Sequence, residues 1–247
     1  MNLIKTNKIL IPLDFSDISL EAVKHACLIL KHNEGEIILL HAHKKNDVLD
    51  FISPEHQFMD KQVTNLASKK LEELAEKIRS ENNIKVSTLI SLGNTTTEII
   101  NAIDKNKIDL IIMGTRGKDS ESSAFMGSNA YRVITKSKIP VISVHSNYIK
   151  PDYENILIPI DTSAHSRQKV DSAIYLADKL KAKLWVIGLI GKSEDNYMYK
   201  MEIIMGQIQK LAKNKNVPCV TEIQTSVNRA VTTLTQGEKA HADLIII

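Results

Sequence analysis

The sequence has few of the residues on which several classes of protein depend. It contains 2 cysteines in 247 residues, too few for the disulfide framework of a small secreted domain. Aromatic residues make up 4% of the chain, which leaves few platforms for stacking nucleic-acid bases. Its apolar runs, such as "DLIIM", are far shorter than the roughly 20 residues of a membrane-spanning helix. These shortages argue against a disulfide scaffold and a membrane-spanning protein.

The chain also lacks a large excess of charge of either sign. The formal net charge is +3, and the lysines are scattered, without basic runs or interleaved aromatics. We therefore expect no nucleic-acid partner. The start of the chain, "MNLIKTNKILIPLD", lacks the apolar core and cleavage site of a signal peptide. We expect a cytoplasmic protein without membrane association, in which Cys27 and Cys219 are buried, reduced thiols.

What the sequence does contain is a repeat. "KILIPLDFS" at 8–16 returns as "NILIPIDTS" at 155–163, and "KIDLIIM" at 107–113 is echoed by "HADLIII" at 241–247. This pattern predicts a tandem duplication with domains at residues 1–147 and 148–247. The second copy reaches only the equivalent of Met113, so it is incomplete at its C-terminus. Because a core strand normally leads into a turn, we expect the natural second copy to continue past Ile247.

Apolar runs alternate with segments of helical period in both copies. Helical spacing is seen in Leu66, Leu74 and Ile78 of the first copy. Ile-, Leu- and Val-rich runs without polar alternation are typical of strands covered on both faces. The pattern predicts an α/β protein with two doubly wound, Rossmann-like parallel sheets of strand order 3-2-1-4-5. The predicted strands are 8–13, 36–42, 84–91, 108–113 and 139–145, then 155–160, 183–190, 217–223 and 242–247.

A glycine-spaced loop follows the fourth predicted strand of the first copy. The stretch "GTRGKDSESSAFMGSN" at 114–129 has the spacing G-x2-G-x9-G-S and leads into a helix. This is neither the G-x-G-x-x-G fingerprint nor a Walker loop. A glycine backbone beside a helix N-terminus suits a phosphate, although a surface loop with a serine N-cap is the alternative. In the predicted strand order, Asp14 after strand one lies beside this loop.

These motifs together resemble the universal stress protein family. The resemblance rests on "ILIPLDFSDIS", "IILLHAH" and "DLIIMGTRG" with the glycine loop, and it extends over nearly all of both copies. Its motifs are specific in the first copy and only architectural in the second. The resemblance implies a five-stranded parallel sheet that binds ATP and a nucleotide-dependent regulatory or interaction role in the stress response. It also implies pairing of the two domains through their last strands. Because the second copy lacks a counterpart of residues 139–145, we expect that strand of the first copy to pair with another molecule in a homo-oligomer.

The same resemblance implies the residues of the nucleotide site. Asp14 and the backbone of Ala42 would hold the adenine end, with Pro12 nearby, and Gly114 would lie against the ribose. Mg²⁺ or Mn²⁺ would accompany the phosphates, and no residue is predicted to bind metal directly. Asp14 has a second interpretation as the cap of the following helix. The residues expected at the phosphates are Thr115, Arg116, Gly117, Lys118, Gly127, Ser128 and Asn129. For Arg116 and Lys118 an equally good interpretation is that they are solvated cations of a surface loop.

Two other functions stay open on the sequence. One is a weak ATPase or nucleotidyl-transferring enzyme, although no G-x-S-x-G, H-E-x-x-H or Walker lysine supports catalysis. The other is a scaffold that binds no nucleotide, because the second copy keeps only Pro159 and Asp161 of the site and is not expected to bind ATP. His41 and His43 would share one face of a strand, but no carboxylate or cysteine with ligand spacing accompanies them. We interpret His41 as a residue of the core or of the site's edge.

Overall fold

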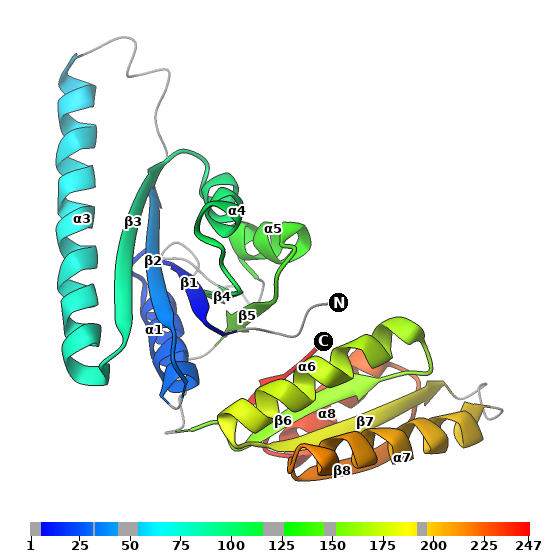
Figure 1. Cartoon of the computed structure of the whole chain (residues 1–247). Coiled ribbons are helices and arrows are strands. Elements are labelled where there is room, and N and C mark those ends of the chain that lie inside the picture. Colours follow the sequence, from blue (N-terminus) through cyan, green and yellow to red (C-terminus); the bar gives the residue numbers. More distant parts are fainter. Residues whose placement is uncertain (1–5, 32, 44–53, 116–125, 146–151, 192–196) are drawn as a thin grey trace. The chain divides into compact units, whose positions relative to one another are not determined.

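The computed structural model describes residues 6–31, 33–43, 54–115, 126–145, 152–191 and 197–247 (Figure 1). The chain divides into two compact units, Lys5–Ile149 and Lys150–Ile247. We call these the first and the second unit. Each is built around its own parallel sheet.

The first unit alternates strands and helices and has the sheet order β3-β2-β1-β4-β5. This confirms the predicted order 3-2-1-4-5, with every strand parallel to its neighbours. Its elements are β1 (Lys8–Pro12), α1 (Asp17–Leu30), β2 (Glu36–His43), α3 (Pro54–Asn82), β3 (Lys85–Leu92), α4 (Thr95–Asn106), β4 (Leu110–Gly114), α5 (Ser128–Lys136) and β5 (Val141–Val144).

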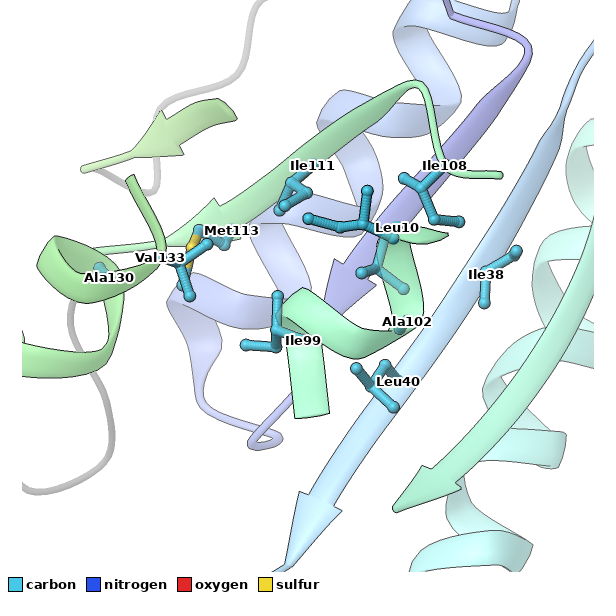
Figure 2. Close-up of a cluster of buried hydrophobic side chains, with 11 residues drawn as sticks. Leu10, Ile38, Leu40, Ile99, Ala102, Ile108, Ile111, Met113, Ala130 and Val133 are labelled. Carbon is cyan, nitrogen blue, oxygen red and sulfur yellow. The ribbon is translucent and has the colours of Figure 1, made fainter. Parts of the chain in front are cut away.

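The strands are apolar on both faces because helices cover both faces. Side chains alternate along a strand, so Leu10, Ile38 and Ile111 face one way and Ile9, Ile37 and Ile112 face the other, all of them buried. Figure 2 shows the first set packed against α4 and α5, through residues that include Ile99, Ala102, Ala130 and Val133. Figure 1 shows α3 on the far side of β3 from α4 and α5. A doubly wound sheet results, as predicted.

Helix α3 buries a stripe that shares only Ile78 with the one we predicted. Among its residues whose burial is described, the buried ones are Ala67, Leu71, Ala75 and Ile78, which recur at the spacing of one helix face. Leu66 is 61% exposed, so its assignment to the apolar stripe was wrong. Small alanines occupy two of the four buried positions, and a search for large apolar residues overlooks them.

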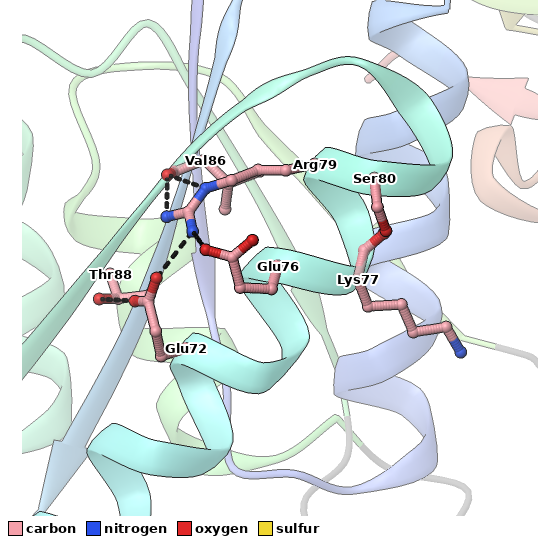
Figure 3. A network of polar contacts seen from close by, with 7 residues as sticks. All are labelled: Glu72, Glu76, Lys77, Arg79, Ser80, Val86 and Thr88. Carbon is pink, nitrogen blue, oxygen red and sulfur yellow. Dashed lines mark hydrogen bonds and ion pairs between the residues drawn. The ribbon is translucent and has the colours of Figure 1, made fainter.

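An arginine from α3 occupies the outer edge of β3. Figure 3 shows the Arg79 guanidinium donating to the Val86 carbonyl through Nε at 3.1 Å and Nη2 at 2.7 Å. Its Nη1 also pairs with Glu72 at 2.7 Å and Glu76 at 2.6 Å. The carbonyl of Val86 points away from β2, because the neighbouring residues of β3 carry the ladder to β2. Arg79 therefore covers a backbone acceptor on an exposed sheet edge.

Replacing Arg79 with alanine is expected to increase self-association of the protein. The change uncovers the Val86 carbonyl on an edge strand, and open strand edges are templates for pairing with another chain. Light scattering across a concentration series should show more association in Arg79→Ala than in Lys77→Ala, a control on the same helix that leaves the guanidinium in place. Equal scattering by the two variants would contradict the protective role.

The second unit has four parallel strands in the order β8-β7-β6-β9. This corresponds to the first unit's order without its fifth strand, within the residues that the structure describes. Its elements are β6 (Asn155–Ile160), α6 (Ala164–Leu180), β7 (Lys183–Gly191), α7 (Met198–Asn214), β8 (Cys219–Ser226), α8 (Arg229–Lys239) and β9 (Leu244–Ile245). Among the described helices of either unit, none combines the length and apolarity needed to cross a bilayer.

Candidate functional site

The predicted site residues of the first unit gather where the carboxyl ends of β1, β2 and β4 meet. β1 lies between β2 and β4, and all three run in one direction. Pro12 is the last residue of β1, Asp14 follows it, Ala42 is near the end of β2, and Gly114 ends β4. The fold thus brings together residues that are far apart in the sequence, at the point where the strand order reverses.

Asp14 uses one of its two carboxylate oxygens to shape the turn into α1. Its Oδ1 accepts from the Ser16 backbone N–H at 2.9 Å and from the Ser16 hydroxyl. Burial raises the pKa of Asp14, but hydrogen bonds from Ser16, from the Ser19 side chain and from the Asp14 backbone together outweigh it and hold the pKa below its usual value. The capping residue of α1 is Ser16, not Asp14. The direct hydrogen bonds from Ser16 thus engage Oδ1, and Oδ2 is the oxygen that they leave for a ligand, on a carboxyl that the Ser19 side chain also approaches.

The backbone of Ala42 is open on the side that faces β1. The β1–β2 ladder ends at Pro12 opposite Leu40, followed by one bond from the Leu13 N–H to the Leu40 carbonyl at 2.8 Å. Backbone groups alternate sides along a strand, so the next groups of β2 that face β1 belong to Ala42. On that side, no described residue bonds to the Ala42 N–H or carbonyl. Ala42 therefore offers one donor and one acceptor side by side.

Gly114 has a packing reason to be glycine. A Cβ built on it would lie 2.4 Å from Ile18 Cγ2 and 3.1 Å from the Ile18 carbonyl carbon, in the first turn of α1. The next residue, Thr115, is 1% exposed, and its hydroxyl donates to the Val144 carbonyl at 2.9 Å. The Thr115 side chain thus serves the fold and joins β4 to β5.

The glycine-rich loop is closed at its base. The Gly127 N–H donates to the Thr115 carbonyl at 2.7 Å, which places the start of α5 beside the end of β4. The predicted phosphate-binding residues Arg116, Gly117 and Lys118 lie outside the described residues. Their assignment stays a prediction.

In the described part of the first unit, no side chain caps the N-terminus of α5. Its N-cap is Gly127, with φ −60° and ψ 147°, and no described side chain accepts from its first turn. In contrast, side chains cap α1, α4, α6 and α8. The exposed Ser128 and Asn129 begin α5, and the Asn129 side-chain oxygen accepts from the Thr96 hydroxyl at 3.4 Å. The free N–H groups and positive dipole end of α5 therefore suit an anion.

In the second unit Asp161 forms the same turn as Asp14, but its carboxylate also pairs with an arginine. Asp161 accepts from the Ser163 N–H at 2.9 Å through Oδ1. Its Oδ2 pairs with Arg229 Nη1 at 3.5 Å, and Arg229 is the first residue of α8, where α4 of the first unit begins with Thr95. Burial raises the pKa of Asp161, whereas the Ser163 hydrogen bonds and the charges of Arg229 and Lys169 lower it below its usual value. Asp161 thus pairs with a cation, which Asp14 does not do with any described residue.

A direct metal centre finds no support in the part of the chain that the structure describes. No three or more His, Cys, Asp or Glu side chains cluster there as metal ligands would.

Known proteins are similar to this chain in sequence and in fold. The model of the universal stress protein family matches residues 5–145. Universal stress protein MJ0531 of Methanocaldococcus jannaschii is 35% identical over 140 residues, which cover 56% of this chain and 81% of that protein. MJ0577 of the same organism is 30% identical over 153 residues, and its solved structure aligns with a TM-score of 0.51 over 57% of this chain and 96% of its own. A universal stress protein structure from Archaeoglobus fulgidus, at 20% identity, matches 98% of this chain and 86% of its own with a TM-score of 0.80, a likeness of fold.

Proposed function

Because the chain belongs to the universal stress protein family, we propose that its first unit binds ATP together with Mg²⁺ or Mn²⁺. In this proposal the protein acts as a nucleotide-dependent regulatory or interaction module of the stress response. The observation that carries it is the convergence of three polar features at the carboxyl end of one sheet, as far as the described residues show: the Ala42 backbone without a ladder partner on the β1 side, the Asp14 oxygen that Ser16 does not engage, and the start of α5 without a capping side chain.

These features are complementary to the parts of ATP. The Ala42 N–H and carbonyl match the adjacent acceptor and donor on the Watson–Crick edge of adenine. Asp14 Oδ2 is an acceptor for an amino or hydroxyl group at the nucleoside end. The N–H groups of Ser128 and Asn129 suit the phosphates. A divalent cation would supply the counter-charge that neutral N–H groups do not.

Calorimetric titration with ATP and Mg²⁺ is expected to show one saturable site per chain. Asp14→Asn keeps an Oδ1 acceptor for Ser16 but replaces Oδ2 with an amide, so affinity should fall by about tenfold. Asp161→Asn is the matched control in the second unit, where Arg229 already occupies the carboxylate. It should leave binding unchanged.

Three kinds of result would argue against the proposal. No saturable binding would favour the scaffold that binds no nucleotide. Two sites per chain, or a loss of affinity in Asp161→Asn, would place nucleotide in the second unit. If ATP binds once and is turned over many times, the enzyme alternative holds instead of the module.

A further inference from the structure

The carbonyl of Leu13 accepts a hydrogen bond from a side chain at a position where a parallel ladder would supply a backbone N–H. His41 Nδ1 lies 2.7 Å from the Leu13 oxygen. A carbonyl oxygen only accepts, so Nδ1 carries the hydrogen and donates it. This contact fixes the tautomer of His41 as well as the orientation of its ring.

The register identifies the backbone group that His41 replaces. Pro12 lies opposite Leu40, and the Leu13 N–H donates to the Leu40 carbonyl. One step further along a parallel ladder, the Leu13 carbonyl would accept from the Ala42 N–H. That bond is not formed. The Leu13 carbonyl is bonded to the His41 ring instead, and the Ala42 N–H does not reach its ladder acceptor.

Phe15 holds the His41 ring in place. The two ring centroids are 5.2 Å apart with planes inclined by 40°, a common tilted aromatic arrangement. Phe15 also has φ 62°, the left-handed conformation that bulky side chains seldom adopt. The chain leaves β1 through this residue, which separates Asp14 from the capping Ser16. An unusual backbone conformation maintained beside a candidate ligand site points to a functional requirement.

The second unit shows the same ladder without the histidine. Pro159 corresponds to Pro12, and Gly188 occupies the position of His41 in the register. There the pairing continues one residue further, to Ile160 opposite Gly188, so the Ile160 carbonyl faces the N–H of Leu189, the counterpart of Ala42. Thr162 replaces Phe15 and is not among the residues with positive φ. The ladder is therefore longer in the unit that lacks the His–Phe pair.

We infer that His41 is a positioning residue of the nucleotide site: it occupies the Leu13 carbonyl so that the Ala42 backbone stays free to bind a planar heterocyclic base. The inference deepens the proposed function and rests on it for the identity of the base. Its structural part is that the Leu13 carbonyl accepts from the His41 ring and not from the Ala42 N–H. This part can be tested in the protein without nucleotide. In the second unit the same backbone is consumed by the sheet.

The test uses two substitutions in the full chain. His41→Gly copies the second unit and should let Ala42 join the ladder. His41→Asn should not, because the asparagine Nδ2 lies close to where Nδ1 of histidine lies and can still donate to Leu13. Selective [¹⁵N]alanine labelling makes the Ala42 amide observable by NMR in the nucleotide-free protein. The buried helical residues Ala26 and Ala102 report any change in stability of the first unit in the same spectra.

We expect hydrogen exchange at Ala42 to slow at least tenfold in His41→Gly, relative to Ala26 and Ala102, and to stay unchanged in His41→Asn. Affinity for ATP with Mg²⁺ should fall at least tenfold in His41→Gly and recover in His41→Asn. Unchanged exchange at Ala42 in His41→Gly, or an Nε2–H tautomer of His41 in the ¹⁵N spectrum, would overturn the inference. If wild-type protein binds no nucleotide while the exchange result holds, the proposed function fails and the ladder competition stands.

Discussion

Gly127→Asp is expected to abolish ATP binding by the first unit while making its fold slightly more stable. Gly127 is the N-cap of α5 with φ −60° and ψ 147°, a backbone conformation open to every residue. An aspartate there would accept from the first-turn N–H groups and interact favourably with the helix dipole. It would also put a negative charge where the proposal places the phosphates. One substitution thus satisfies the helix and excludes the ligand.

The magnitudes of the two effects differ. A better cap than glycine contributes a few tenths of a kcal/mol, and the charge at the helix N-terminus adds about 0.5 kcal/mol at low salt. Like-charge repulsion in the site costs several kcal/mol, so affinity should fall at least a hundredfold. Calorimetry and chemical unfolding measure the two effects on the same samples.

Gly127→Asn separates capping from charge. Asparagine caps as well as aspartate but is neutral, so it should weaken binding far less than aspartate does. Equal losses in both variants would mean that the side chain blocks the site sterically. Undiminished affinity in Gly127→Asp would show that the phosphates do not lie at the start of α5.

The strands could be predicted from the sequence because both faces of each sheet are covered. Burial on both faces demands uninterrupted Ile, Leu and Val, and such runs are visible at Leu10 and Ile111 without any knowledge of partners. The stripe of α3 was less visible, since a helix face can be built from alanines as at Ala67 and Ala75. The strand order could be predicted from the fold class, because sequences of alternating strands and helices form only a small number of sheet topologies.

The site was only partly predictable, for a different reason. Asp14, Gly114 and Gly127 stand out as residue types with special chemistry. The free N–H of the Ala42 backbone depends instead on a hydrogen bond from His41 in β2 to Leu13 at the end of the neighbouring strand β1. These two residues are close in space and far apart in the sequence. The left-handed conformation of Phe15 leaves no mark in the sequence either, because it occurs at a residue type that rarely adopts it. A positive φ can usually be predicted from the sequence only where the residue is glycine or asparagine.

Gly114→Ala is expected to destabilise the first unit by about 2–3 kcal/mol, the cost of overpacking a closed contact. The added Cβ meets the backbone of Ile18 as well as its side chain, so a rotamer change does not relieve the clash and the first turn of α1 must move. That turn is capped by Ser16, which also bonds to Asp14. The same displacement should therefore weaken ATP binding.

Gly206→Ala is the matched control, and Trp185 allows the two units to be followed separately. Gly206 lies in α7 with no atom within 4 Å of an added Cβ, so the substitution should stabilise the second unit by about 1 kcal/mol through helix propensity.

The chain has 1 tryptophan, and Trp185 lies in β7, so its fluorescence reports on the second unit, whereas circular dichroism reports on both. In denaturant, Gly114→Ala should move the dichroism transition to lower concentration and leave the fluorescence transition in place, and Gly206→Ala should raise the fluorescence midpoint. An unshifted dichroism transition in Gly114→Ala would mean that α1 yields to the new methyl without cost, and Gly114 would then have to be glycine for the ligand's sake and not for packing.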